Sequence, residues 1–247
     1  ISSQGGNITL DGRAGTAVGA NPTQEGVIIK GNITTIGNGE ISISGTGGQG
    51  AEGNFGIEAF DNALISTENG FLYMGGVSGP GDSVGLRLGN FGGGPAVVTS
   101  IAGTIFLLGD GSAGTLTGIE TFGAGVMIGG PSTTGAINLV ADRISLGSNV
   151  RSSGELSVTV LDETSSIGLG DGNGTFHLSN TEIAYLQDGF SSITLGNLPN
   201  FGTGLVEIGA ITLLDQTMIQ GGSLLVGGIN AVGNTIRNLT TSSTSAT

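Results

Sequence analysis

The chain has 247 residues, of which 51 are glycine, five are proline and none is cysteine, so it can form neither disulfides nor a thiolate metal site. Hydrophobic residues account for 37% of the chain and charged residues for 10%; this composition argues against disorder, and no collagen-like Gly-x-y period occurs. The formal net charge of −13 argues against nucleic acid and anionic membranes as partners, and no apolar run is long enough for membrane insertion.

A short unit recurs along the chain: a glycine followed by apolar residues at the second and fourth positions after it. Such alternation is typical of half-buried strands, and strands this short bury their apolar faces only by stacking on one another. The sequence therefore predicts an all-β fold, a single-stranded right-handed parallel β-helix (β-solenoid) of about 8–12 rungs, with about 30 residues per rung early and about 20 later. The units begin at Gly6, Gly39, Gly70, Gly103, Gly135, Gly154, Gly174, Gly204 and Gly222.

The first complete period predicts three short strands and one corner. The strands are expected at residues 27–29, 33–36 and 41–43, where β-branched residues are frequent, and the glycine-rich segment 45–50 is expected to turn the chain. In all rungs together, the inward-facing structural ladder is predicted to comprise Ile41, Ile43, Leu72, Met74, Ile105, Leu107, Ile137, Leu139, Leu156, Val158, Phe176, Leu178, Ile193, Leu195, Val206, Ile208, Leu224 and Val226.

The repeat spacing shortens near Gly135, from about 32 residues to about 20. We interpret this as a change of rung size within one continuous solenoid, residues 1–239, in which glycine-rich loops such as 75–85 are lost; two domains are the alternative. Residues 179–182 have the spacing of a helix capping box, but an extended strand or corner is favoured there. Residues 240–247, rich in Ser and Thr, are expected to be a tail or linker.

Candidate catalytic residues are few. The local groups of charge are Asp162 with Glu163, Asp142 with Arg143, Asp11 with Arg13, and Glu52 with Glu58 and Asp61. We interpret these groups as a solvated outer face, and the single histidine, His177, as a surface residue, because it alternates with Phe176 and Leu178. No catalytic residue, cofactor or enzymatic activity is therefore expected. A β-helix polysaccharide lyase or glycoside hydrolase is the alternative.

Two further patterns raise the question of ligands. Asp110 and Asp171 each lie in a Gly-Asp-Gly segment, but the two segments are far apart in the chain, whereas calcium β-rolls repeat at short intervals; turn chemistry explains them better than bound calcium. Nine phenylalanines recur through the rungs. We expect them in core or corner ladders, with an exposed row able to stack on sugars as the alternative.

Residues 135–146 and 182–196 resemble the strand–turn–strand unit of the filamentous-haemagglutinin class of large secreted bacterial adhesins. This similarity in the style of repeat runs through most of the chain. The Asn-Pro-Asn motifs of that family's secretion domain are missing, since Asn21-Pro22 is followed by Thr23. The resemblance implies an extracellular, cell-surface protein with a non-catalytic structural or adhesive function, for which surface glycans are candidate partners.

The ends of the predicted solenoid point to a partner. An open solenoid exposes unpaired backbone groups on its first and last rungs, and no amphipathic capping helix is visible near either end of this sequence. We expect either head-to-tail stacking with another copy, as in a fibre-forming subunit, or covalent continuation in a longer chain, as in an adhesin shaft. The absence of an initial Met indicates a processed product or a segment.

Overall fold

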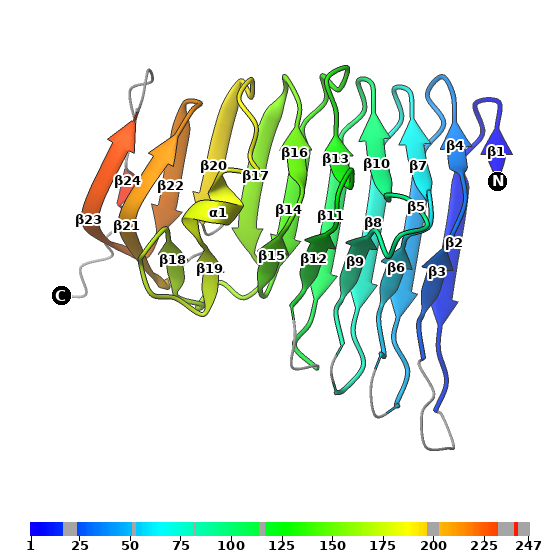
Figure 1. The fold of residues 1–247 in the computed structure, drawn as a ribbon, viewed down its shortest axis with the longest axis horizontal. Coiled ribbons are helices and arrows are strands. Elements are labelled where there is room, and N and C mark those ends of the chain that lie inside the picture. Colours follow the sequence, from blue (N-terminus) through cyan, green and yellow to red (C-terminus); the bar gives the residue numbers. More distant parts are fainter. Residues whose placement is uncertain are drawn as a thin grey trace.

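The structure is a computed structural model that describes residues 1–16, 24–50, 53–81, 83–113, 117–196, 203–231 and 240–241. Within these residues the chain winds as a parallel β-helix, in which each strand pairs in parallel with its counterpart in the next rung (Figure 1). In the first rungs the chain passes in turn through a nine-stranded, a five-stranded and a six-stranded sheet. The parallel β-helix predicted from the repeat is confirmed.

The nine-stranded sheet runs along the whole described molecule. Its strands stack in the order β2 (Ile8–Arg13), β5 (Ile41–Thr46), β8 (Leu72–Val77), β11 (Ile105–Asp110), β14 (Ile137–Ala141), β17 (Glu155–Val160), β20 (Ser192–Gly196), β22 (Thr217–Gly221) and β24 (Thr240–Thr241).

The early rungs add two further sheets. The five-stranded sheet contains β3 (Val27–Ile29), β6 (Ile57–Ala59), β9 (Leu86–Gly89), β12 (Ile119–Phe122) and β15 (Ile144–Leu146). The six-stranded sheet contains β1 (Ser2–Ser3), β4 (Ile33–Thr35), β7 (Leu64–Thr67), β10 (Val97–Ser100), β13 (Met127–Gly129) and β16 (Asn149–Arg151).

The later rungs are built differently. A four-stranded sheet in the order β19 (Phe176–Leu178), β18 (Ile167–Leu169), β21 (Leu205–Leu213) and β23 (Ser223–Ala231) lies beyond the five-stranded sheet (Figure 1). The repeat units that begin at Gly174, Gly204 and Gly222 therefore contribute to this sheet rather than to the nine-stranded one. An alternating pattern shows that one face of a strand is buried, but it does not specify the sheet to which the strand belongs.

The register gives the true length of each rung. Along the nine-stranded sheet, Ile8, Ile41, Leu72, Ile105 and Ile137 stack on one another, and the near-constant step between them is the repeat period expected for the early rungs. The next step, from Ile137 to Leu156, is much shorter, as expected. The step from Leu156 to Ile193 is longer than any of these, contrary to expectation, because the chain forms β18, β19 and a short helix before it returns to the sheet.

That helix, α1 (Asn180–Ile183), occupies the segment in which the sequence favours a strand or corner, so this prediction is wrong. A capping box explains the helix: the Ser179 hydroxyl accepts a hydrogen bond from the Glu182 amide, and the Glu182 carboxylate accepts one from the Ser179 amide. The Ser- and Thr-rich segment 240–247 is expected to be a tail or linker. Within it, Thr240 and Thr241 form β24 and pair with Gln220 and Gly221, so the nine-stranded sheet extends into this segment. Residues 242–247 lie outside the described residues.

Glycines inside the strands let two backbone segments of each early rung come into contact. β5 and β8 continue beyond the predicted strand ends, so Gly45 and Gly76 lie inside strands rather than in corner turns. At each of these glycines a Cβ would overlap the carbonyl oxygen of a glycine that precedes the next strand, Gly56 or Gly85. The early rungs thus narrow to two backbone layers in direct contact, a spacing that only glycine permits. At the same register position β14 has Ala141, and the following rung is the short one.

Candidate functional site

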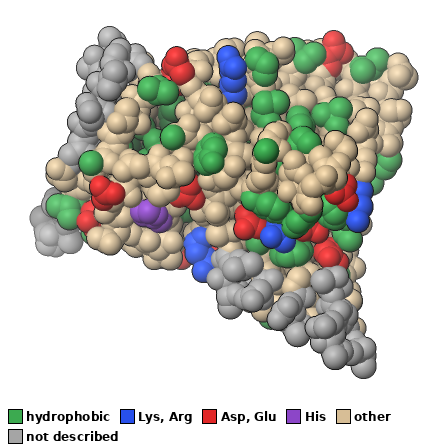
Figure 2. Space-filling view, in the orientation of Figure 1, with side chains coloured by type: hydrophobic (Ala, Val, Ile, Leu, Met, Phe, Trp, Pro, Cys, Tyr) green, Lys and Arg blue, Asp and Glu red, His purple; other side chains and the backbone are tan. Residues whose placement is uncertain are grey.

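Charged side chains gather on the outer face of the five-stranded sheet. Glu58, Arg87 and Glu120 occupy one register position in β6, β9 and β12. Arg87 Nη1 lies 3.4 Å from Glu58 Oε1, and Arg87 Nε lies 2.7 Å from Glu120 Oε2. Burial raises the pKa of Glu58, although the neighbouring guanidinium opposes that shift. Figure 2 shows acidic, basic and hydrophobic side chains together over this part of the molecule.

Aromatic rings enclose the same guanidinium. The Arg87 Cζ atom lies 4.9, 5.3 and 4.8 Å from the ring centroids of Phe55, Phe91 and Phe122. Two carboxylates and three rings therefore engage this cation, and it is already neutralised within its own chain. A polysaccharide-active enzyme needs a cation or carboxylate pair that is free to meet substrate, and this cluster offers none.

The rings continue as a row along the solenoid axis. Phe60 and Phe91 pack edge to face with centroids 5.3 Å apart, Phe91 and Phe122 lie 4.8 Å apart, and Lys30 Nζ lies 4.5 Å from the Phe60 centroid. Phe91 is 56% exposed at the middle of the row. Phe176 and Phe190, in contrast, lie in the core. The phenylalanines thus divide between the core and a partly exposed row.

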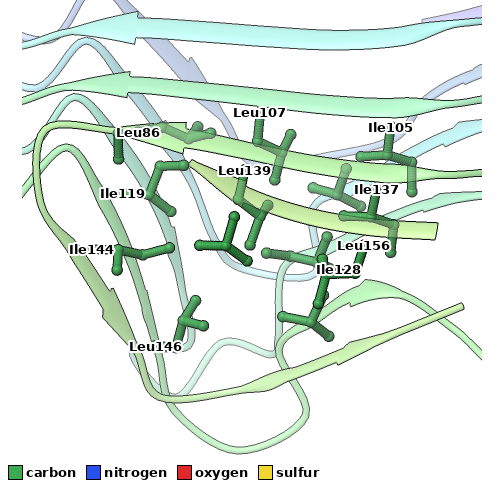
Figure 3. Packing of buried hydrophobic residues seen from close by; sticks show 14 of the residues in the cluster. Leu86, Ile105, Leu107, Ile119, Ile128, Ile137, Leu139, Ile144, Leu146 and Leu156 are labelled. Atoms are coloured by element: carbon green, nitrogen blue, oxygen red, sulfur yellow. The ribbon is translucent and has the colours of Figure 1, made fainter. Parts of the chain in front are cut away.

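The predicted inward ladder lies mostly in one continuous core, part of which Figure 3 shows. Ile41, Ile43, Leu72, Met74, Ile105, Leu107, Ile137, Leu139, Leu156, Val158, Phe176, Leu178, Ile193, Leu195, Val206 and Ile208 are all buried. The last two positions differ: Leu224 is partly buried and Val226 is 48% exposed. Both belong to β23, which lies at the end of the four-stranded sheet among the described residues.

The other charged candidates serve local structure. Arg143 Nε lies 3.5 Å from Asp142 Oδ2, and Asp142 Oδ1 accepts a hydrogen bond from the Gly111 amide. Asp162 accepts hydrogen bonds from the amide and hydroxyl of Thr164, which lower the pKa of its carboxyl. These contacts hold turns, which agrees with the outer-face interpretation.

The remaining catalytic candidates are dispersed. The His177 ring nitrogen Nε2 lies 3.0 Å from the Gly170 carbonyl oxygen on the outer side of β19. Asp61 lies in the turn after β6, with a left-handed φ of 53°. Asp11 and Arg13 lie on the exposed face of β2, and Glu52 lies outside the described residues.

The two calcium candidates lie on separate rungs. The Asp110 carboxylate, at the end of β11, accepts a hydrogen bond from the Ser112 amide at 2.9 Å, as in an Asx turn. Asp171 follows β18 in the turn that leads to β19. Across the described ranges, no three His, Asp or Glu side chains are grouped so that they could hold a metal ion.

The first rung presents an open edge. β1, β2 and β3 are terminal in their three sheets, and their outer edges have no strand partner among the described residues. Beside them a shallow hollow of about 300 Å³ is lined by apolar side chains that include Ile1 and Ile28, which are 67% and 49% exposed. Unpaired strand edges next to exposed apolar residues are suited to receive another rung.

No family model, curated protein or solved structure matches this chain. Among the described residues, no helix has the length and apolar character needed to cross a membrane. The open first rung and the exposed faces of the sheets are therefore the features that bear on function.

Proposed function

We propose that this chain is a non-catalytic structural and adhesive β-solenoid of the cell surface, either a fibre-forming subunit or a shaft segment of a large secreted adhesin. The observation that carries this proposal is the open first rung, in which the ends of three sheets and an apolar hollow lie side by side. Any further rung of the same cross-section would continue all three ladders and cover that hollow. The covering rung comes from a second copy in a fibre, and from the same polypeptide in a shaft.

The hydrophobic core supports a structural role. Buried aliphatic side chains form one cluster from Ile8 to Ile219, without a break between the early and late rungs. Such a core gives a stiff rod whose backbone is paired along its length. The adhesin part of the proposal rests on the similarity of residues 135–146 and 182–196 to filamentous-haemagglutinin repeats.

Electron microscopy of the purified chain at micromolar concentration tests this proposal, with two variants of one edge residue. The amide of Val27 donates to Gly56 in the next rung, so the amide of Ile28, the next residue, points to the open edge of β3. Ile28→Pro removes that donor and obstructs the edge, whereas Ile28→Ala keeps it and serves as the matched control.

Filaments that are lost in Ile28→Pro but kept in Ile28→Ala support a fibre-forming subunit. Separate rods in all three proteins support a shaft, in which neighbouring rungs are covalent. Globular particles without an axial repeat of about 4.8 Å, or release of reducing ends from polysaccharides, would contradict the proposal.

A further inference from the structure

A groove crosses the outer face of the nine-stranded sheet over its first strands. Its volume is about 390 Å³, and its lining includes Asp11, Arg13, Ser44, Tyr73 and Gly75. This size lies at the lower end of the range of small-ligand sites. The groove lies on a different sheet from the Arg87 cluster.

The strand register explains the groove. Asp11, Ser44, Gly75 and Leu108 occupy one outward-facing position in β2, β5, β8 and β11. The two middle residues are small, and those at both ends are larger, so the stacked positions form a depression along the axis.

The side chain of Tyr73 lies along the sheet rather than away from it. A Cβ at Gly75 would meet the Tyr73 hydroxyl, which places the ring over that glycine. The ring also stacks with Phe106 of the next rung, at a centroid distance of 5.9 Å and an interplanar angle of 29°. Tyr73 therefore offers the groove a flat apolar surface with a polar tip.

Among the residues that the structure describes, the polar side chains of the groove have no hydrogen-bonding partner. The side chains of Asp11, Arg13, Ser44, Thr46 and Tyr73 form no hydrogen bond or ion pair with any residue that the structure describes. Together they offer a carboxylate, a guanidinium and three hydroxyls. In the Arg87 cluster, by contrast, the charges are already satisfied by one another.

We propose that this groove binds a neutral oligosaccharide, which would make it a contact site of the adhesive function proposed above and rests on that function. A sugar has apolar C–H faces for Tyr73 and hydroxyls for the surrounding donors and acceptors. The opposite charges of Asp11 and Arg13 cancel, and the net charge of −13 opposes sialylated or sulfated chains. Neutral hexose and N-acetylhexosamine oligosaccharides fit this chemistry.

The test measures binding of the chain to an array that contains neutral, sialylated and sulfated oligosaccharides. Calorimetry then measures the affinity for the neutral oligosaccharide that is bound most tightly.

Tyr73→Ala is expected to weaken this binding at least about tenfold, which corresponds to about 1.4 kcal/mol. Gly75→Ala is expected to weaken binding in the same direction, because it displaces the ring and leaves its chemistry unchanged. Phe91→Ala is the matched control: Phe91 is a 56% exposed ring in the Arg87 cluster, on a different sheet, and does not line the groove, so its loss should change affinity less than about twofold.

Preference for anionic glycans, the absence of binding to any neutral one, or equal losses in Tyr73→Ala and Phe91→Ala would overturn the glycan site. Electron microscopy of the unmodified chain separates this failure from that of the solenoid's structural role. Rods or filaments without glycan binding reject the glycan site alone, whereas globular particles in place of rods reject the proposed function itself.

Discussion

Gly76 of β8 lies directly against the backbone carbonyl of Gly85, the residue before β9. A Cβ at Gly76 would overlap that carbonyl oxygen, and neither segment can withdraw without moving a rung. At the neighbouring Gly75, the nearest atoms to a Cβ all belong to the Tyr73 side chain, its hydroxyl and the adjoining ring carbons, and this side chain can swing away. Two adjacent glycines of one strand therefore have different reasons to lack a side chain.

Gly76→Ala is accordingly expected to destabilise the protein by about 1–3 kcal/mol, the usual cost of forcing extra atoms into a closely packed region. Gly75→Ala, at the adjacent position, should change stability by less than about 0.5 kcal/mol. Urea denaturation followed by circular dichroism measures both. Equal transition midpoints for the two variants would show that the backbone layers are not in contact at Gly76.

The sequence predicted the solenoid because its inward positions repeat at the rung length. Ile41, Leu72, Ile105 and Ile137 each follow a glycine at a near-constant interval, and the structure stacks them in that order. The later rungs were less predictable, since Phe176 has the same local pattern but belongs to another sheet. Which sheet a strand joins depends on pairing between distant residues, and that information is not local.

The candidate surfaces were predictable only in part. Glu58, Arg87 and Glu120 follow one another at intervals close to the rung length, so their alignment could have been found from the period. Phe60, Phe91 and Phe122 also follow one another at the rung length, so the row of rings could have been found in the same way, whereas Phe55 has no such counterparts at that spacing. In the groove, Asp11 and Arg13 stand out as a charged pair in the sequence, but the position of the Tyr73 ring depends on the space above Gly75.

The core ladder gives a prediction about burial. Ile105 is fully buried between Leu72 and Ile137, whereas Ile101, shortly before it in the chain, is 51% exposed. Ile105→Ala should lower the free energy of unfolding by about 2–5 kcal/mol through the cavity it leaves, and Ile101→Ala by less than about 0.5 kcal/mol. Denaturant titration of the two variants checks this. A similar cost at both positions would contradict the inward orientation of β11.

The ion pairs of Arg87 give a prediction about coupling. Arg87→Met leaves the buried Glu58 carboxylate without its cation and should cost about 1–3 kcal/mol. In the double variant with Glu58→Gln the Glu58 position carries no charge to leave unpaired, and the loss of the Glu120 pair is common to both Arg87→Met proteins, so the combined loss should be smaller than the sum of the single losses by about 0.5–3 kcal/mol. A double-mutant cycle in urea measures the difference. Strictly additive losses would mean that the two side chains do not interact.

The pKa of Glu58 gives a prediction about pH. Burial raises this pKa above its ordinary value of 4.5, so between 4.5 and the raised value the folded chain binds more protons than the unfolded chain. The stability contributed by the Glu58 carboxyl is therefore greatest at low pH and falls as pH rises through the folded pKa.

The variant Glu58→Gln isolates this contribution, because Gln cannot ionise. The unfolding free energy of Glu58→Gln minus that of the unmodified protein should increase as pH rises from 4.5 to 7. Asp215, whose pKa burial also raises, is common to both proteins, and its contribution cancels in the difference. Urea denaturation at several pH values tests the slope, and a difference that stays constant or decreases with pH would show that the carboxylate is not held in a buried setting.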